Sequence, residues 1–152
     1  NDAVAYNNRA LVYFFKGKFD STLDDCKKAI ELKPDLAYAY HLCGLIYFYR
    51  QNYTLAIDYF NKATGFKADL VETYHYRGQI YLTMGKYELS ISDFSKAIIL
   101  RPKAARAYNS RGEAYYSLRE FEKAIEDWRK AHKIDPRYPT SLYAREILGL
   151  KK

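Results

Sequence analysis

The hydrophobic and small residues of this chain recur with a period of 34 residues. This interval separates Pro102 from Pro136, and Pro34 precedes Pro102 by twice the interval, with Ala68 in the slot between them. Four units in the same phase align without gaps and cover 3–36, 37–70, 71–104 and 105–138. Such a period indicates a repeat protein, in which units stack because none can bury its apolar surface alone.

Each unit contains two apolar stripes with helical spacing. The first has Tyr at positions 4 and 11 and Ala or Gly at position 8, which lie on one face of a helix. The second has an aromatic residue at position 17, a small residue or Thr at position 20 and Ala at position 27. Gly17 and Gly85 fall between the stripes, where a turn is needed, and proline follows the second stripe in three units because it cannot continue a helix. The pattern predicts helices at 3–16, 20–33, 37–50, 54–67, 71–84, 88–101, 105–118, 122–135 and 139–149.

The repeat resembles the tetratricopeptide repeat (TPR) in its small residue at position 8, Tyr at 11, Ala near 20, aromatic residue at 24, Ala at 27 and Pro at 32. The resemblance covers residues 3–138. Position 4 departs from the family pattern with Tyr in place of Trp, and position 7 has Arg or Cys in place of Leu. The resemblance implies an all-α fold, a right-handed α-solenoid of four TPR helical hairpins followed by a C-terminal capping helix at 139–150. The small residue at position 8 is expected to let the paired helix approach closely.

Composition and charge exclude several classes of protein. Hydrophobic residues make up 49% of the chain, which is typical of a globular fold. The net charge is +7, but the basic residues are spread among acidic ones and the aromatic residues follow core spacing, so we expect no nucleic-acid binding. The longest apolar run without a charged residue, Leu36–Tyr49, has 14 residues and is too short to cross a bilayer, so we expect no membrane insertion.

The two cysteines, Cys26 and Cys43, are too few for a disulfide framework. We interpret them as small buried hydrophobic residues in a reducing compartment. Together with the absence of a signal-peptide pattern, this predicts a cytoplasmic location.

The sequence contains no motif that would assemble a catalytic site. GxGxxG, P-loop, HExxH and GxSxG patterns are all absent, so we expect neither enzymatic activity nor a cofactor. His41 and His75 both occupy position 5, one repeat apart, and could face each other across neighbouring helices. A metal would need a third ligand, for which Glu72 is the acidic candidate near that row. Two separate imidazoles that line a groove are the simpler interpretation, and we expect no metal.

By the resemblance, positions 2, 5, 6, 9, 12 and 13 of each first helix face a concave groove in which partner peptides or helices lie. These positions are apolar and aromatic in the first two units and polar in the last two. An exposed apolar patch is typical of a binding site. The candidate partner-binding residues are Asn7, Asn8, Leu11, Phe14, Tyr38, His41, Leu45, Phe48, Tyr49, His75, Gln79, Arg106 and Asn109. Phe15 and Tyr49, both at position 13, could equally pack as core beneath neighbouring helices.

The predicted function is a non-catalytic protein–protein interaction scaffold that binds a peptide or helix of a partner. One TPR subclass binds the acidic tails of heat-shock chaperones through a two-carboxylate clamp, with Lys at position 5 and Asn at 9, then Asn at 6, then Lys at 2 and Arg at 6. No register of this sequence restores the clamp; with the first clamp repeat at 37–70, Arg106 alone matches. The alternative is self-assembly into a homo-oligomer through the apolar groove or the uncapped first hairpin. An amino-terminal segment of a longer parent chain could also cover the groove.

Overall fold

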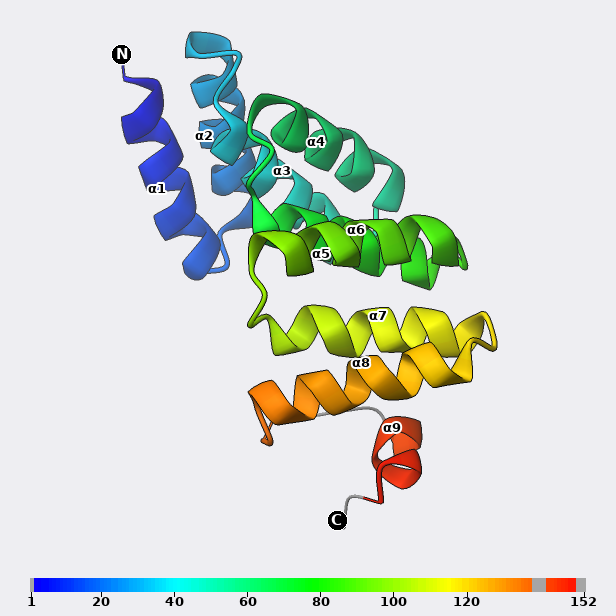
Figure 1. Ribbon diagram of the computed structural model, residues 1–152. Coiled ribbons are helices and arrows are strands. Elements are labelled where there is room, and N and C mark those ends of the chain that lie inside the picture. The colour runs from blue at the N-terminus through cyan, green and yellow to red at the C-terminus, as the bar shows by residue number, and fades with distance from the viewer. Residues whose placement is uncertain (1, 138–141, 150–152) are drawn as a thin grey trace. The chain divides into compact units, whose positions relative to one another are not determined.

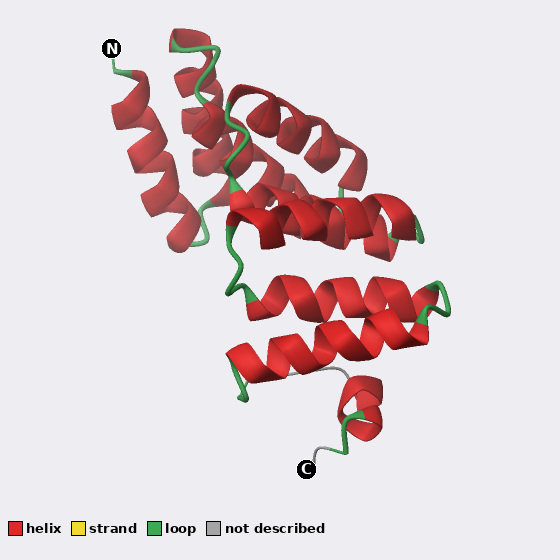
Figure 2. Ribbon diagram, viewed as in Figure 1, coloured by secondary structure: helices red, strands yellow, loops and turns green. Residues whose placement is uncertain are grey.

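The computed structural model describes residues 2–137 and 142–149, and within these ranges it contains helices and no strand (Figures 1 and 2). The helices are α1 (Ala3–Phe15), α2 (Phe19–Leu32), α3 (Ala37–Tyr49), α4 (Tyr53–Phe66), α5 (Val71–Thr83), α6 (Tyr87–Leu100), α7 (Ala105–Ser117), α8 (Phe121–Ile134) and α9 (Leu142–Ile147). The bounds of α1 to α8 agree with the predicted ones to within one residue at each end, and the predicted all-α class is confirmed. Of the predicted capping helix, residues 139–141 and 150 lie outside the described residues.

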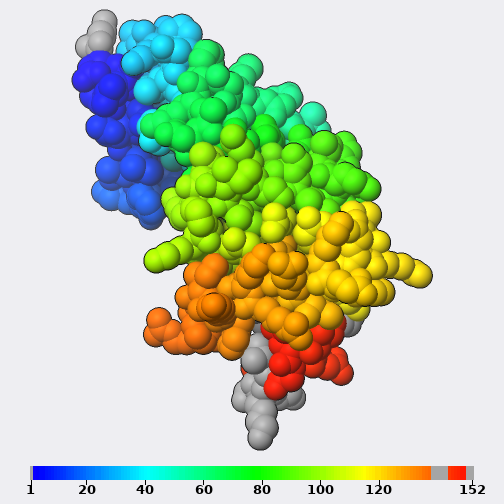
Figure 3. All heavy atoms as spheres, in the orientation of Figure 1, coloured from blue at the N-terminus to red at the C-terminus, as the bar shows by residue number. Residues whose placement is uncertain are grey.

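The chain forms two compact units, residues 1–77 and 78–152, and α5 runs across the boundary between them. In the first unit, α1 packs against α2, α2 against α3, and α3 against α4. In the second unit, α6 packs against α7, α7 against α8, and α8 against α9, whose red atoms adjoin the orange atoms of α8 in Figure 3. Successive helices therefore bury their apolar stripes against each other within each unit.

A residue with a left-handed backbone lies in each turn between a first and a second helix. Gly17 and Gly85, where turns were predicted, both have φ of 70°. Gln51 and Arg119 occupy the equivalent places in the other two turns, with φ of 57° and 62°. In the first turn the N–H of Gly17 donates to the carbonyl of Phe14 at 2.9 Å, which satisfies one of the last carbonyls of α1.

The small residue at position 8 brings the two helices of a hairpin into close contact. A Cβ atom added to Gly44 would lie 2.5 Å from two ring carbons of Phe60, which is wholly buried at position 24. The position-8 glycines of the second unit are covered in the same way by aromatic residues at position 24. In the first hairpin position 8 is Ala10 and position 24 is Cys26, both wholly buried. A larger residue at position 8 is thus accompanied by a smaller one at position 24.

Arg at position 7 joins the two helices of a hairpin through a carboxylate at position 23. Arg9 donates to Asp25 from Nε and Nη2 at 2.6 and 2.7 Å, and Arg111 donates to Asp127 from the same atoms at 2.7 and 2.8 Å. Both carboxylates are buried. Each guanidinium also lies 5.3 to 5.8 Å from the ring centroids of the tyrosines at positions 4 and 11. The charges are therefore compensated by paired hydrogen bonds and by aromatic faces.

The second hairpin replaces this ion pair with neutral groups. Position 7 is Cys43 and position 23 is Tyr59, whose ring stacks on that of Tyr47 with centroids 5.3 Å apart. Burial is the main cause that raises the pKa of Tyr59 to about 12. A hydrogen bond with Cys43, together with burial, raises the pKa of Cys26, and both cysteines are free and buried. The two thiols therefore belong to the core between α2 and α3.

Candidate functional site

A hollow of about 360 Å³ opens in the first unit, between side chains of α1, α3 and the start of α5. It is lined by Asn7, Leu11, Phe14, Phe15, Tyr38, His41, Leu42, Leu45, Glu72 and Tyr76. Asn7, Leu11 and Phe14 are spaced by four and three residues, so they share one face of α1. The hollow is therefore built from the groove-facing sides of successive first helices.

The hollow has an apolar floor and an exposed apolar rim. Leu42 and Leu45 are only 4% and 6% exposed, so they form the floor. Leu11, Tyr38 and Phe15 are 40%, 47% and 79% exposed, and Phe15 is the most exposed large apolar residue among those described. Exposed apolar residues around a concave surface are the usual mark of a binding site, because burying them is favourable.

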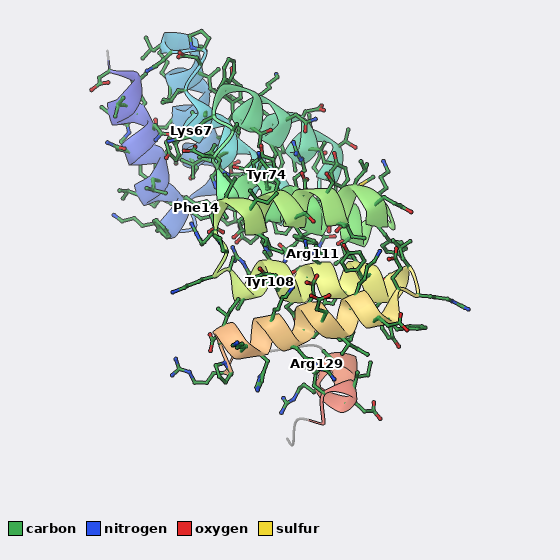
Figure 4. All side chains as sticks on the ribbon, in the orientation of Figure 1. Phe14, Lys67, Tyr74, Tyr108, Arg111 and Arg129 are labelled. Atoms are coloured by element: carbon green, nitrogen blue, oxygen red, sulfur yellow. The ribbon has the colours of Figure 1, made fainter. Side chains whose placement is uncertain are left out.

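Aromatic contacts hold one wall of the hollow in place. The ring of Phe14 lies 5.8 Å from that of Phe15, 6.1 Å from that of Phe19 and 6.0 Å from that of Tyr49. The rings of Phe19 and Tyr49 stack with centroids 6.2 Å apart. Figure 4 labels Phe14 on α1. Since rings at these separations attract one another, this cluster fixes the orientation of Phe14 at the hollow.

The polar groups at the hollow are mostly engaged by neighbours. Nδ1 of His41 lies 2.8 Å from the hydroxyl of the buried Thr73, within hydrogen-bonding distance. Burial lowers the pKa of His41 to about 4, and the Glu72 carboxylate acts in the opposite direction, so the imidazole is neutral at pH 7. The hydroxyl of Tyr38 accepts a hydrogen bond from Nζ of Lys67 at 3.0 Å. This ammonium, labelled in Figure 4, lies 4.7 Å from the Tyr38 ring centroid, which anchors that ring at the rim.

Acid is expected to destabilise the fold through His41. Its pKa is about 4 in the folded state, against about 6.5 in an unfolded chain. Between these pH values the unfolded chain binds more protons, so the free energy of unfolding falls as the pH is lowered from about 6.5 to 4. The expected loss is on the order of 2–3 kcal/mol. Urea unfolding at pH 7 and pH 4.5 measures this loss of unfolding free energy. The variant His41→Gln should lose clearly less between the two pH values. Equal losses in the two proteins would contradict the role given to His41.

Six of the thirteen predicted site residues line the hollow, and the other seven are not among its lining residues. Asn7, Leu11, Phe14, Tyr38, His41 and Leu45 line it. Asn8 is exposed on α1 outside it, and Tyr49 stacks on Phe19. Phe48 packs against Tyr76 with ring centroids 5.2 Å apart. His75 is 2% exposed, so its ring is not presented to a ligand.

The remaining predicted residues belong to the second unit. Gln79 and Arg106 are half-buried. Asn109 is buried, donates from Nδ2 to the Glu113 carboxylate at 3.0 Å, and accepts from the Trp128 indole at its carbonyl. Burial raises the pKa of Glu113, with the Asn109 hydrogen bond opposing the shift. Asn109 therefore contributes to internal packing of the second unit.

Four residues of the hollow were not among the candidates: Phe15, Leu42, Glu72 and Tyr76. They occupy positions 13, 6, 2 and 6, which the resemblance assigns to the groove, so the positional signal was present in the sequence. For Phe15 the sequence left a core role open, and its 79% exposure favours the groove.

Few ionisable side chains lie at the hollow. Among the residues that the structure describes, no three His, Cys, Asp or Glu side chains are grouped so that they could hold a metal ion. Glu72 is the charged residue among the ten that line the hollow, and the His41 imidazole is neutral at pH 7. No described helix is both long enough and apolar enough to cross a membrane. The arrangement offers an apolar surface with a few hydrogen-bonding groups, as protein-binding surfaces do.

Comparisons with known proteins place the chain in a family. A family model described as tetratricopeptide repeat matches residues 3–36 and 105–138, another of the same description matches 37–70, and a model described as TPR repeat matches 78–119. A comparison with curated protein sequences gave no match.

Several solved structures are similar to the chain. MamA is 25% identical with a TM-score of 0.83, over 90% of this chain and 80% of that one. Pseudomonas aeruginosa PilF is 19% identical with a TM-score of 0.85, over 97% and 68%. The first TPR domain of Spaghetti (RPAP3), solved with the HSP90 peptide SRMEEVD, is 25% identical with a TM-score of 0.68, over 74% and 87%. With the repeat pattern and the helical architecture, these matches show that the chain belongs to the tetratricopeptide-repeat family.

Proposed function

We propose that the chain is a non-catalytic interaction module that binds a peptide or helix of a partner protein in the hollow of its first unit. The tetratricopeptide-repeat fold supports protein–protein interaction in general. The observation that carries the specific proposal is the concave apolar surface of about 360 Å³ built from α1, α3 and α5. This volume lies within the range of about 300–1,000 Å³ that is typical of ligand sites.

The exposed rim favours an apolar anchor on the partner. Leu11, Phe15 and Tyr38 surround a floor of buried leucines, so an inserted aliphatic or aromatic side chain would be desolvated on several sides. Binding energy at protein interfaces concentrates on such buried anchors. The partner is therefore expected to present at least one large apolar side chain.

The charge at the hollow argues against an acidic tail as the ligand. The similar RPAP3 domain was solved with the peptide SRMEEVD, which ends in acidic residues. Here the charged residue among those lining the hollow is Glu72, and position 5, where the carboxylate clamp needs Lys, is His41. Since His41 is neutral at pH 7, it supplies no charge for a carboxylate. The favoured ligand is a neutral or basic segment with an apolar anchor.

The substitution Leu11→Glu should weaken binding at the hollow. Peptides selected from a displayed helical library provide the ligands, and fluorescence anisotropy measures their affinity. Placing a charge in the apolar rim is expected to weaken selected peptides by at least about tenfold. Val12→Glu is the matched control, because Val12 is the next residue on α1, is 50% exposed and does not line the hollow. Equal losses in the two variants, or none in Leu11→Glu, would overturn the proposal.

Self-assembly is the second candidate, and the exposure of α1 favours it. Leu11, Val12 and Phe15 are 40%, 50% and 79% exposed on this one helix. Light-scattering mass over a hundredfold concentration range separates the two functions. A monomer at all concentrations supports a foreign ligand, whereas a dimer that Leu11→Glu dissociates would show that a second copy occupies the hollow.

A further inference from the structure

Aromatic rings from three helices line the hollow of the first unit. Phe14 and Phe15 come from α1, Tyr38 from α3 and Tyr76 from α5. The ring of Tyr76 is held in place by Phe48, with the two ring centroids 5.2 Å apart. The face of an aromatic ring carries partial negative charge and attracts cations. The hollow therefore presents surfaces that suit a cationic group as well as an apolar one.

A carboxylate lies among these rings. Glu72 precedes Tyr76 by four residues on α5, so the two side chains share one face of that helix. The Glu72 charge acts on the pKa of His41, which places the carboxylate near the side chains of α3. A carboxylate has about four acceptor sites, so it can bind a ligand in addition to groups of its own chain. The hollow thus combines aromatic faces with a negative charge.

The amide of Asn7 adds an acceptor on α1. Oδ1 of Asn7 is buried, and no donor within the described part of the chain forms a hydrogen bond with it. Such an oxygen loses its hydrogen bonds with water on folding and gains none from the protein. Rotation about the terminal torsion of asparagine, which has a broad energy profile, would turn this oxygen toward a donor in the hollow. A ligand with several N–H groups is therefore favoured.

The chain itself shows which cation a set of rings and a carboxylate holds. Arg9 and Arg111 (the latter labelled in Figure 4) each donate two hydrogen bonds to a buried carboxylate, that of Asp25 or Asp127. The centroids of two tyrosine rings lie 5.3 to 5.8 Å from each guanidinium carbon. Lysine forms its ion pairs at exposed places, as Lys130 does. A guanidinium is planar, so it matches both a carboxylate and a ring face.

We propose that the hollow binds an arginine side chain of the partner, next to the apolar anchor, with the guanidinium on the aromatic rings and hydrogen-bonded to Glu72. This inference rests on the proposed binding function of the hollow and names a residue that its ligand carries. The anchor packs on Leu42 and Leu45, which form the floor. In a helical ligand the arginine lies within one turn of the anchor, since residues three or four apart share a face.

The other charges around the hollow are compatible with a guanidinium. Burial lowers the pKa of His41 to about 4, so its imidazole is neutral at pH 7 and does not repel a cation. A lysine, Lys67, lies at the rim, where its Nζ is 4.7 Å from the ring centroid of Tyr38. This contact shows that a ring of the rim attracts a cation. The Asp69 carboxylate, 3.9 Å from the same Nζ, offsets the lysine charge.

Peptides selected on the full chain from the displayed helical library test the arginine requirement. We expect them to carry arginine within one turn of their apolar anchor. Replacing it by citrulline, which is neutral and nearly the same shape, should weaken binding by at least about tenfold, measured by fluorescence anisotropy. In Glu72→Gln the same replacement should change the affinity by less than about threefold. Glu31→Gln is the matched control, because Glu31 pairs with Lys28 on the exposed surface of α2, and it should keep the tenfold loss.

Charge reversal provides a second test. Peptides selected on Glu72→Lys should carry Asp or Glu where the arginine stood, and circular dichroism verifies that this variant and Glu72→Gln keep their helices. Arginine again at that place would overturn the proposal, as would selected peptides that bind equally well with lysine or citrulline in place of arginine.

Failure of this proposal can be told apart from failure of the binding function. Leu11→Asn makes the rim of the hollow polar without adding a charge. Peptides that Leu11→Asn weakens and citrulline does not would overturn the arginine proposal and leave the proposed function intact. Peptides that Leu11→Asn does not weaken bind elsewhere, and they would overturn both.

Discussion

Replacing Arg111 with alanine is expected to lower the free energy of unfolding by about 3 kcal/mol. Arg111 holds the Asp127 carboxylate with two hydrogen bonds, at 2.7 and 2.8 Å, and a third bond joins it to Ser95 on α6. Asp127 is 3% exposed, so the truncation leaves a charge buried without its partner. The hydrogen bond with Asp127 is also the main cause that raises the pKa of Arg111. Removing one member of a buried pair costs far more than removing one of an exposed pair.

Lys130→Ala provides the matched control for Arg111→Ala. Nζ of Lys130 lies 2.7 Å from the Glu126 carboxylate, but both side chains are largely exposed on α8. The loss of this pair is expected to change the free energy of unfolding little, because water replaces the contact. Urea unfolding at pH 7, followed by circular dichroism, measures both variants. Similar losses of unfolding free energy in the two variants would show that the burial of Asp127 does not make its ion pair more stabilising than the exposed one.

Gly44→Ala is expected to lower the free energy of unfolding by about 1–3 kcal/mol. The new Cβ atom would lie 2.5 Å from two ring carbons of Phe60. Phe60 is wholly buried between the helices of the hairpin, so its ring cannot turn away into solvent. The helices must separate or the ring must leave its favoured rotamer, and either change strains the core.

Gly65→Ala in the same hairpin should have the opposite sign. Gly65 lies within α4, and a Cβ atom added there meets no atom within 4 Å. Alanine loses less backbone freedom than glycine on folding into a helix, so a gain of about 0.5 kcal/mol is expected. The urea midpoints of Gly44→Ala and Gly65→Ala show the sign of each effect, and the two can be compared because the same chemical change is made in both. Two changes of the same sign would contradict the packing account of position 8.

The helices could be predicted from the sequence because their periodicity is strong and local. The bounds of α1 to α8 follow from stripes that repeat in a fixed phase, and the close approach at Gly44 follows from a small residue facing an aromatic one. The turns were partly marked by glycine, at Gly17 and Gly85. Gln51 and Arg119 adopt the same left-handed conformation without that mark. The surrounding hairpin imposes this conformation, which a residue with a side chain otherwise rarely adopts.

The candidate site was less predictable, because residues at the same repeat position have different neighbours. Phe14 lines the hollow, whereas Phe48, its equivalent in the next repeat, packs against Tyr76. His41 lines the hollow and His75 is buried. Position in the repeat fixes the side of the helix, but the neighbouring helices decide whether a side chain there is open to a ligand. That information lies in contacts between segments distant in sequence.

The most direct test of the proposed binding hollow is site-specific photo-crosslinking from its rim. The photoreactive residue p-benzoylphenylalanine would replace Phe15, which is 79% exposed beside the hollow, or Ile99, which is 71% exposed on α6 and serves as the control. If the chain is a binding module of the proposed kind, the photoreactive residue at position 15 forms a discrete crosslinked product with another protein, and Leu11→Glu removes that product. The photoreactive residue at position 99 forms no such product. The same products from both positions, or a product that survives Leu11→Glu, would contradict the account.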